Sequence, residues 1–151
     1  MGLLDRVRDL LRKPESAGLG LDTPGLKIVA EAFDPAQADS SVLAGSPGWV
    51  TEAEAVLRHH LALPREKVTE AARILAQDDW ELREADECGP GSGETGLVTL
   101  HALRVQRLDA LHCAQERSRM AGLAQRLGGD SLGWDALQPG APPEEMPTGS
   151  A

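Results

Sequence analysis

Residues 97–137, LVTLHALRVQRLDALHCAQERSRMAGLAQRLGGDSLGWDAL, contain the clearest fold unit of the chain. Residues 97–105 are rich in β-branched and aliphatic side chains and follow a Gly/Ser loop, which predicts a strand. Asp109 is the predicted N-cap of the next helix, because its carboxylate can accept a free N–H of the first turn. Gly128-Gly129 predicts the end of that helix. Residues 132–137 are long enough for one further short strand.

The helix within this unit has a predicted buried side. Small and apolar residues recur there at helical spacing, and the alanines among them would let the helix lie close to a sheet. The predicted positions are Cys113, Arg117, Met120, Ala124 and Leu127, with Ala110, Ala114 and Ala121 beside them.

Length and composition indicate one compact domain with appendages in 151 residues. The net charge of −9 argues against a dedicated nucleic-acid binder, because no excess of Lys and Arg is available to neutralise phosphates. Cys88 and Cys113 are isolated, which predicts neither a disulfide framework nor a zinc site. The sequence contains no secretory signal and no apolar run long enough to span a membrane. We therefore expect a cytoplasmic protein with no cofactor.

Residues 1–13, MGLLDRVRDLLRK, predict an amphipathic helix with one apolar stripe. Such a helix can dock on its own domain, on a partner protein or on a membrane surface, and docking on protein is favoured because no aromatic anchor is present. The positions that we expect to bind a partner are Leu3, Val7, Leu10 and Leu11.

Residues 14–52 are predicted to be a linker and a variable segment. Within it, residues 26–33 fit helical spacing and strand alternation equally well, and Thr23-Pro24 favours a helix because it supplies a cap and a first helical residue. Residues 34–48 contain Asp, Ser, Pro and Gly throughout, which predicts a loop.

Residues 53–61 are ambiguous as well. Thr51 and Glu54 have the spacing of a capping box, which favours a helix, whereas Val56, Leu57 and Leu61 can also lie on a strand. Pro64 is predicted to open a helix over REKVTEAARILAQDD, and alternation in residues 80–84 predicts a strand after it.

The order of these elements decides between the alternatives. If residues 55–61 form a strand, the order becomes β-α-β-β-α-β, the split plan of ferredoxin-like domains. The predicted fold is therefore α+β, with a ferredoxin-like domain over residues 53–138, the N-terminal amphipathic helix as an extension, and a disordered tail over residues 139–151.

Residues 55–137 resemble the regulator of ribonuclease E activity B family. The resemblance rests on the VLRHHL segment with its paired histidines, the KVTEAARIL helix, the WEL strand, LVTLHALRVQRLDAL, and a long helix ending in GG before GWDAL. It implies a non-enzymatic ferredoxin-like protein that binds an RNA-degrading endoribonuclease and restrains its activity. No binding residue is carried over, because the resemblance lies at structural positions.

Three function classes remain open from the sequence. The first is the non-enzymatic regulator that binds another protein, either through the Leu3/Val7/Leu10 stripe or through the sheet face opposite the helices. The second is a small-ligand sensor or dimerisation module that uses the same open sheet face, which includes a homodimer. The third is a peripheral subunit of a complex or membrane surface, tethered by residues 1–13.

His59, His60 and His101 are the candidate metal ligands. We expect one of the paired histidines to share a sheet face with His101, where two imidazoles could begin a zinc or copper site. The favoured interpretation is that these side chains bond to neighbours on the sheet, because no Cys or acidic residue is placed to complete a ligand set.

Other candidate motifs are interpreted as structural, and no catalytic residue is predicted. Cys113 is expected to face the core and not His112. Cys88 and GPGSGETG (89–96) are expected to lie in a hairpin loop, because the phosphate-loop lysine is missing. A run of acidic residues is expected to be a solvated edge. It consists of Asp78, Asp79, Glu81, Glu84, Asp86 and Glu87.

Overall fold

A computed structural model describes residues 19–85 and 96–140. The described residues form an α+β fold with a five-stranded antiparallel sheet and three α-helices. The elements are β1 (Leu26–Ala32), α2 (Asp39–Ala44), β2 (Glu54–Pro64), the short 3-10 turn η2 (Arg65–Lys67), α3 (Val68–Ala76), β3 (Glu81–Glu84), β4 (Leu97–Arg107), α4 (Ala110–Arg126) and β5 (Asp130–Pro139).

The strands lie in the order β1-β5-β2-β4-β3, and every neighbouring pair is antiparallel. β2 is central and pairs along its full length with β4, so the predicted strand at residues 55–61 is confirmed and the local capping box does not form a helix. The predicted strands at residues 80–84, 97–105 and 132–137 are confirmed as β3, β4 and β5.

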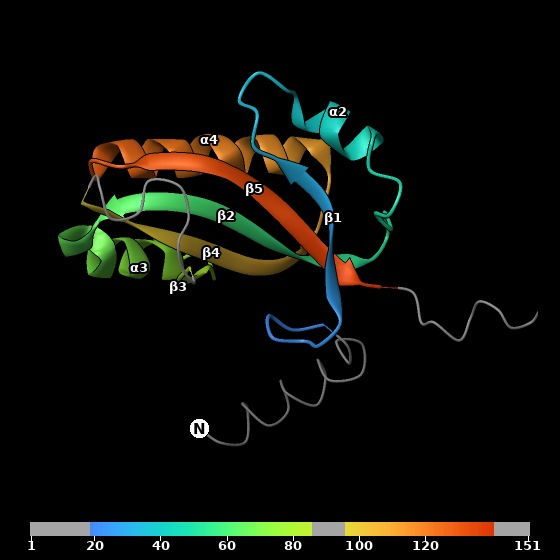
Figure 1. Cartoon of the computed structure of the whole chain (residues 1–151), viewed down its shortest axis with the longest axis horizontal. Coiled ribbons are helices and arrows are strands. Elements are labelled where there is room, and N and C mark those ends of the chain that lie inside the picture. Colours follow the sequence, from blue (N-terminus) through green and yellow to red (C-terminus); the bar gives the residue numbers. More distant parts are fainter. Residues whose placement is uncertain (1–18, 86–95, 141–151) are drawn as a thin grey trace, which may run out of the picture.

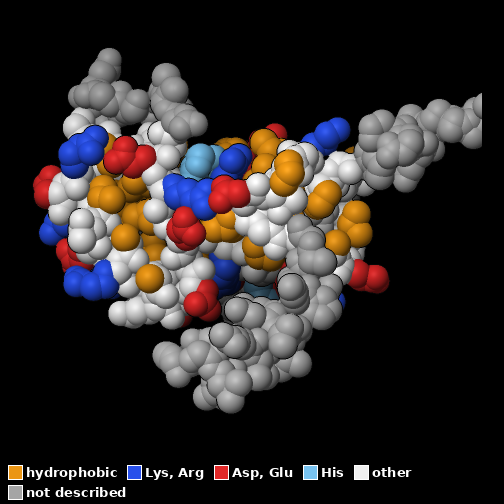
Figure 2. All heavy atoms as spheres, turned by 90° about the horizontal axis from the view of Figure 1, so that it is seen from below, with side chains coloured by type: hydrophobic (Ala, Val, Ile, Leu, Met, Phe, Trp, Pro, Cys, Tyr) orange, Lys and Arg blue, Asp and Glu red, His pale blue; other side chains and the backbone are white. Residues whose placement is uncertain are grey.

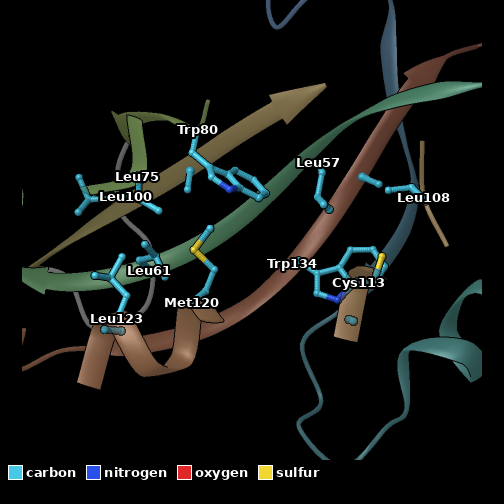
Figure 3. Packing of buried hydrophobic residues seen from close by; sticks show 14 of the residues in the cluster. Leu57, Leu61, Leu75, Trp80, Leu100, Leu108, Cys113, Met120, Leu123 and Trp134 are labelled. Carbon is cyan, nitrogen blue, oxygen red and sulfur yellow. The ribbon is translucent and has the colours of Figure 1, made fainter. Parts of the chain in front are cut away.

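One face of the sheet carries the helices. α4 runs along β5 behind the strands. α3 lies beside β3, at the opposite edge of the sheet from β1 (Figure 1). Met120 and Leu123 of α4 point toward Leu61 of β2, and Trp134 of β5 lies beside Cys113 (Figure 3). Trp80 and Trp134 thus pack in a core that consists mostly of alanine and leucine.

The boundaries of α4 follow the sequence closely. The Asp109 carboxylate accepts the backbone N–H of His112 at 2.8 Å, as the cap prediction requires. Gly128 ends the helix at φ +86°, a conformation that costs glycine little. The predicted buried side is wrong in part, because Ala114 and Ala121 are exposed. Leu123 and Glu116, which were not predicted to be buried, are buried.

The helix predicted over residues 26–33 is wrong. These residues form β1, which pairs with β5 and buries Ala30 and Ala32 in the core. β1 supplies hydrogen-bond partners for an edge of β5 that would otherwise be unpaired, and this non-local gain outweighs the local helix signal.

The loop predicted over residues 34–48 is also wrong in part, because α2 forms there. Its Asp39 carboxylate accepts bonds from Arg117 of α4 at 2.6 Å and from the Trp134 indole at 3.1 Å. Val42 and Leu43 join the core. Pro64 ends β2 instead of opening a helix, and α3 begins at Val68 after the 3-10 turn.

The predicted amphipathic helix at residues 1–13 and most of the predicted tail lie outside the described residues. None of the helices in the described ranges has the length and apolar content that crossing a membrane requires.

Candidate interaction face

The face of the sheet opposite the helices carries a compact group of rings and charges, which we call the interaction face: Phe33, Arg58, His60, His101 and Asp135. Side chains alternate between the two faces of a strand, so the pairing register decides which residues meet. His60 on β2 lies directly opposite His101 on β4, and Arg58 lies opposite Asp135 on β5.

The rings of this face contact one another edge to face. The His60 and His101 ring centroids are 4.4 Å apart, and those of Phe33 and His60 are 4.9 Å apart. Gly133 of β5 lies opposite His60, and a Cβ at Gly133 would come within 2.5 Å of the Phe33 ring. The glycine therefore leaves the space in which Phe33 approaches His60.

Asp135 is the buried anchor of the face, with 2% of its surface exposed. Its two carboxylate oxygens accept bonds from Arg58 at 2.8 and 2.7 Å, and one of them lies 3.1 Å from Nε2 of His60. Burial alone would raise the pKa of this carboxyl, but the bonds from His60 and Arg58 outweigh it and hold the pKa below its ordinary value. The carboxylate thus stays charged and fixes both partners.

Arg83 of β3 lies opposite His101 and extends the polar row to the edge of the sheet. Its guanidinium donates to Glu81 at 2.8 Å and to both oxygens of Asp22 at 2.9 and 3.2 Å. The segment that precedes β1 is thereby tied to the strand at the opposite edge of the sheet.

The prediction that one of the paired histidines shares a face with His101 is confirmed for His60. His59 lies on the helix-covered face, fully buried, and neither ring nitrogen has a hydrogen-bond partner in the described part of the chain. The expectation that each histidine bonds to a neighbour is therefore met by His60, through Asp135, and not by His59. Among residues 19–85 and 96–140, no group of three or more His, Cys, Asp or Glu side chains is placed to hold a metal ion.

Cys113 faces the core as predicted, with its thiol buried. Burial raises the pKa of this thiol to about 12, so it carries no thiolate at neutral pH. His112 is bonded to Asp109 at 2.6 Å and is exposed. Cys88 and residues 89–95 lie outside the described residues.

The acidic run predicted as a solvated edge is largely ion-paired where it is described. Asp78 pairs with Arg119, Glu81 with Arg83 at 2.8 Å, and Glu84 with Arg65 at 3.6 Å. Acidic and basic side chains also lie next to one another on the side of the molecule seen in Figure 2. Asp86 and Glu87 are not among the described residues.

The sequence reasoning missed Phe33, Arg58 and Asp135. Arg58 was open to detection, because it alternates with His60 and must share its face once β2 is a strand. Asp135 could not be detected from the sequence, because its contacts with Arg58 and His60 depend on how β5 pairs with β2.

No protein-family model matches this sequence, and a search of curated proteins finds no match either. The predicted partner-binding residues Leu3, Val7, Leu10 and Leu11 lie outside the described residues.

Proposed function

We propose that this chain is a non-enzymatic regulatory protein that binds another protein through the interaction face. The observation that carries this proposal is the cluster of rings and a guanidinium on the face of the sheet opposite the described helices. Aromatic rings and arginines are enriched at protein interfaces, where they supply much of the binding energy. Asp135 holds His60 and Arg58 in place, which lowers the ordering cost of binding.

We further propose that β2-α3-β3-β4-α4-β5 is a ferredoxin-like domain to which β1 adds a fifth strand. Support comes from the order of these six elements and from the strand order β5-β2-β4-β3. In this arrangement each helical crossover joins two strands that have a third strand between them, which is the split plan.

By the resemblance of residues 55–137 to the regulator of ribonuclease E activity B family, the proposed partner is a ribonuclease E-like, RNA-degrading endoribonuclease in the cytoplasm. A protein partner of this kind is compatible with the net charge of −9, which disfavours direct contact with RNA. On this proposal the chain would lower the rate of RNA cleavage by occupying the enzyme and not its substrate.

The test is capture of a ribonuclease E-like enzyme by the immobilised chain, with RNA cleavage measured in parallel. Phe33→Ala should weaken capture at least about tenfold, the effect of an interface ring. Leu111→Ala is the matched control, because Leu111 is a 63% exposed apolar residue on α4 and Phe33 is 44% exposed.

Two results would count against the proposal in different ways. Equal loss of capture in both variants would remove the interaction face as the contact. A chain that neither retains the endoribonuclease nor changes its cleavage rate would remove the ribonuclease partner.

A further inference from the structure

A groove of about 340 Å³ runs beside β1. One wall consists of the four consecutive residues Ile28–Glu31, and the other consists of α2 and the turn after it, including Ser41, Val42 and Pro47. Successive residues of a strand point to opposite faces of the sheet. A hollow that touches four residues in a row therefore lies along the edge of the strand and not on either face.

This edge of β1 has no strand partner in the described part of the chain. Within residues 19–85 and 96–140, β1 ends the strand order and pairs only with β5. Its outer N–H and C=O groups are thus free to bond to another backbone, and such an edge is a template for an added strand.

An exposed apolar side chain lies at the same edge. Ile28 is 50% exposed and lines the groove, and Val50, three residues after Pro47 in the chain, is 57% exposed. The Val50 backbone bonds to Gln138, the residue opposite Lys27 in the β1–β5 register, so Val50 lies near β1. Exposed apolar groups beside a free strand edge are typical of a binding surface.

The charge of the groove indicates which kind of segment it would bind. Among the described residues that line the groove, Glu31 alone is charged, and none of the ion pairs of the described ranges involves it. An occupant that places a Lys or Arg opposite Glu31 would neutralise it, whereas an acidic segment would be repelled.

We propose that this groove binds an extended, basic segment of a partner protein, which adds to the free edge of β1 as a sixth strand. Such a contact uses a second binding surface, which adjoins the interaction face at Glu31, the residue opposite Asp135. α2 and the turn after it form the far wall of the groove, opposite β1.

The experiment titrates a synthetic peptide, acetyl-Thr-Val-Lys-Val-Thr-Val-amide, into the isotope-labelled chain and follows the amide NMR signals. Shifts should be confined to Ile28–Ala32 and to residues 41–47. A peptide with Glu in place of Lys should bind at least about tenfold more weakly. A peptide N-methylated at every residue should not bind, because neither of its edges then keeps a backbone donor for β1.

Glu31→Lys should reverse the preference between the Lys and Glu peptides. Glu66→Lys, an exposed charge reversal in η2, is the matched control and should leave the preference unchanged. Binding that ignores the charge at position 31, or shifts at His60 and His101 in place of β1, would overturn the proposal. So would a concentration-dependent dimer that protects Ile28–Glu31, because a second copy would then fill the groove. None of these readouts requires the endoribonuclease, so this proposal and the proposed function can fail separately.

Discussion

At the scale of single residues, His59 is the most unusual side chain of the core. Its ring is fully buried against Trp80, with ring centroids 5.3 Å apart, and both nitrogens lack hydrogen-bond partners within the described ranges. Burial lowers the pKa of His59 to about 3, helped by the positive charges of Arg104 and Arg117. The imidazole is therefore neutral in the folded protein and costs free energy that an apolar side chain would not.

His59 should make the fold sensitive to acid. Because its folded-state pKa lies below the ordinary value of 6.5, the unfolded chain takes up the proton first. The unfolding free energy therefore has its full value above pH 6.5. It falls as the pH drops toward 3, by up to about 1.4 kcal/mol per pH unit. His59→Leu should remove this part of the pH dependence and stabilise the protein by about 1 kcal/mol at neutral pH. Urea denaturation at a series of pH values measures both effects.

His112→Asn is the control for that experiment. The bond to Asp109 raises the pKa of His112, so its contribution to stability is present below 6.5 and is lost as the pH rises through the raised value. The control should keep the acid slope of the parent. A His59→Leu protein that lost stability as steeply as the parent between about pH 6 and pH 4 would show that other groups cause the slope.

Gly133 lies at a position of the sheet that has no room for a side chain. Its φ is +137°, and a Cβ there would lie 2.5 Å from the Ala32 carbonyl oxygen and from the Phe33 ring. Gly133→Ala should therefore destabilise the fold by about 3 kcal/mol and separate Phe33 from His60. Gly122→Ala, at an open position of α4, should be neutral or stabilising. Similar melting temperatures for the two variants would refute the steric argument.

At the scale of elements, the position of α2 depends on polar bonds to neighbouring elements, because the helix itself is short. It has six residues, and its Asp39 carboxylate joins α4 through Arg117 and β5 through Trp134. Arg117 also donates to the carbonyl oxygens of Gln37 and Asp34, so one guanidinium fixes the approach to the helix. The position of α2 beside β1, and with it the groove, depends on this carboxylate.

Asp39→Ala should destabilise the protein by about 3 kcal/mol, because the buried indole N–H and the guanidinium each lose a partner. Both bonds go to the same oxygen of Asp39, so Asp39→Asn keeps that acceptor and should cost less. The unfolding free energy of both variants tests this order, and hydrogen exchange should increase first in residues 39–44. Equal stability of the parent and Asp39→Ala would mean that packing of Val42 and Leu43 alone holds α2.

At the scale of the whole molecule, β1 and α2 belong to the same core as the later elements. Ala30, Ala32 and Leu43 pack in one cluster with Trp134 and Ala136. Removing β1 and α2 would uncover this part of the core and leave β5 as a free edge.

A chain of residues 53–140 should therefore unfold less cooperatively than one of residues 19–140, and it should bind a dye for exposed apolar surface. Calorimetry and dye fluorescence on the two chains make the comparison. A chain of residues 53–140 with an equally sharp transition would show that β1 and α2 are dispensable additions.

Prediction from sequence succeeded where the signals were local. The cap at Asp109, the stop at Gly128 and the apolar strand at residues 97–105 all involve residues close together in the chain. β1 was missed because LKIVAEA satisfies two periodicities, and only β5, more than a hundred residues later, decides between them. The pairing of Arg58 with Asp135 was missed for the same reason, since register between distant strands cannot be read from either strand alone.

The neighbouring positions of β1 and β5 also bear on the synthesis of the chain. Leu26 pairs with Pro139, and the N–H of Gly140 donates to the carbonyl of Gly25 at 3.2 Å. β1 therefore leaves the ribosome well before β5, the strand with which it pairs, so this part of the described sheet can form only after β5 has been translated. The same closeness means that a short peptide could join residues 25 and 140, and the chain could then be opened at another surface turn.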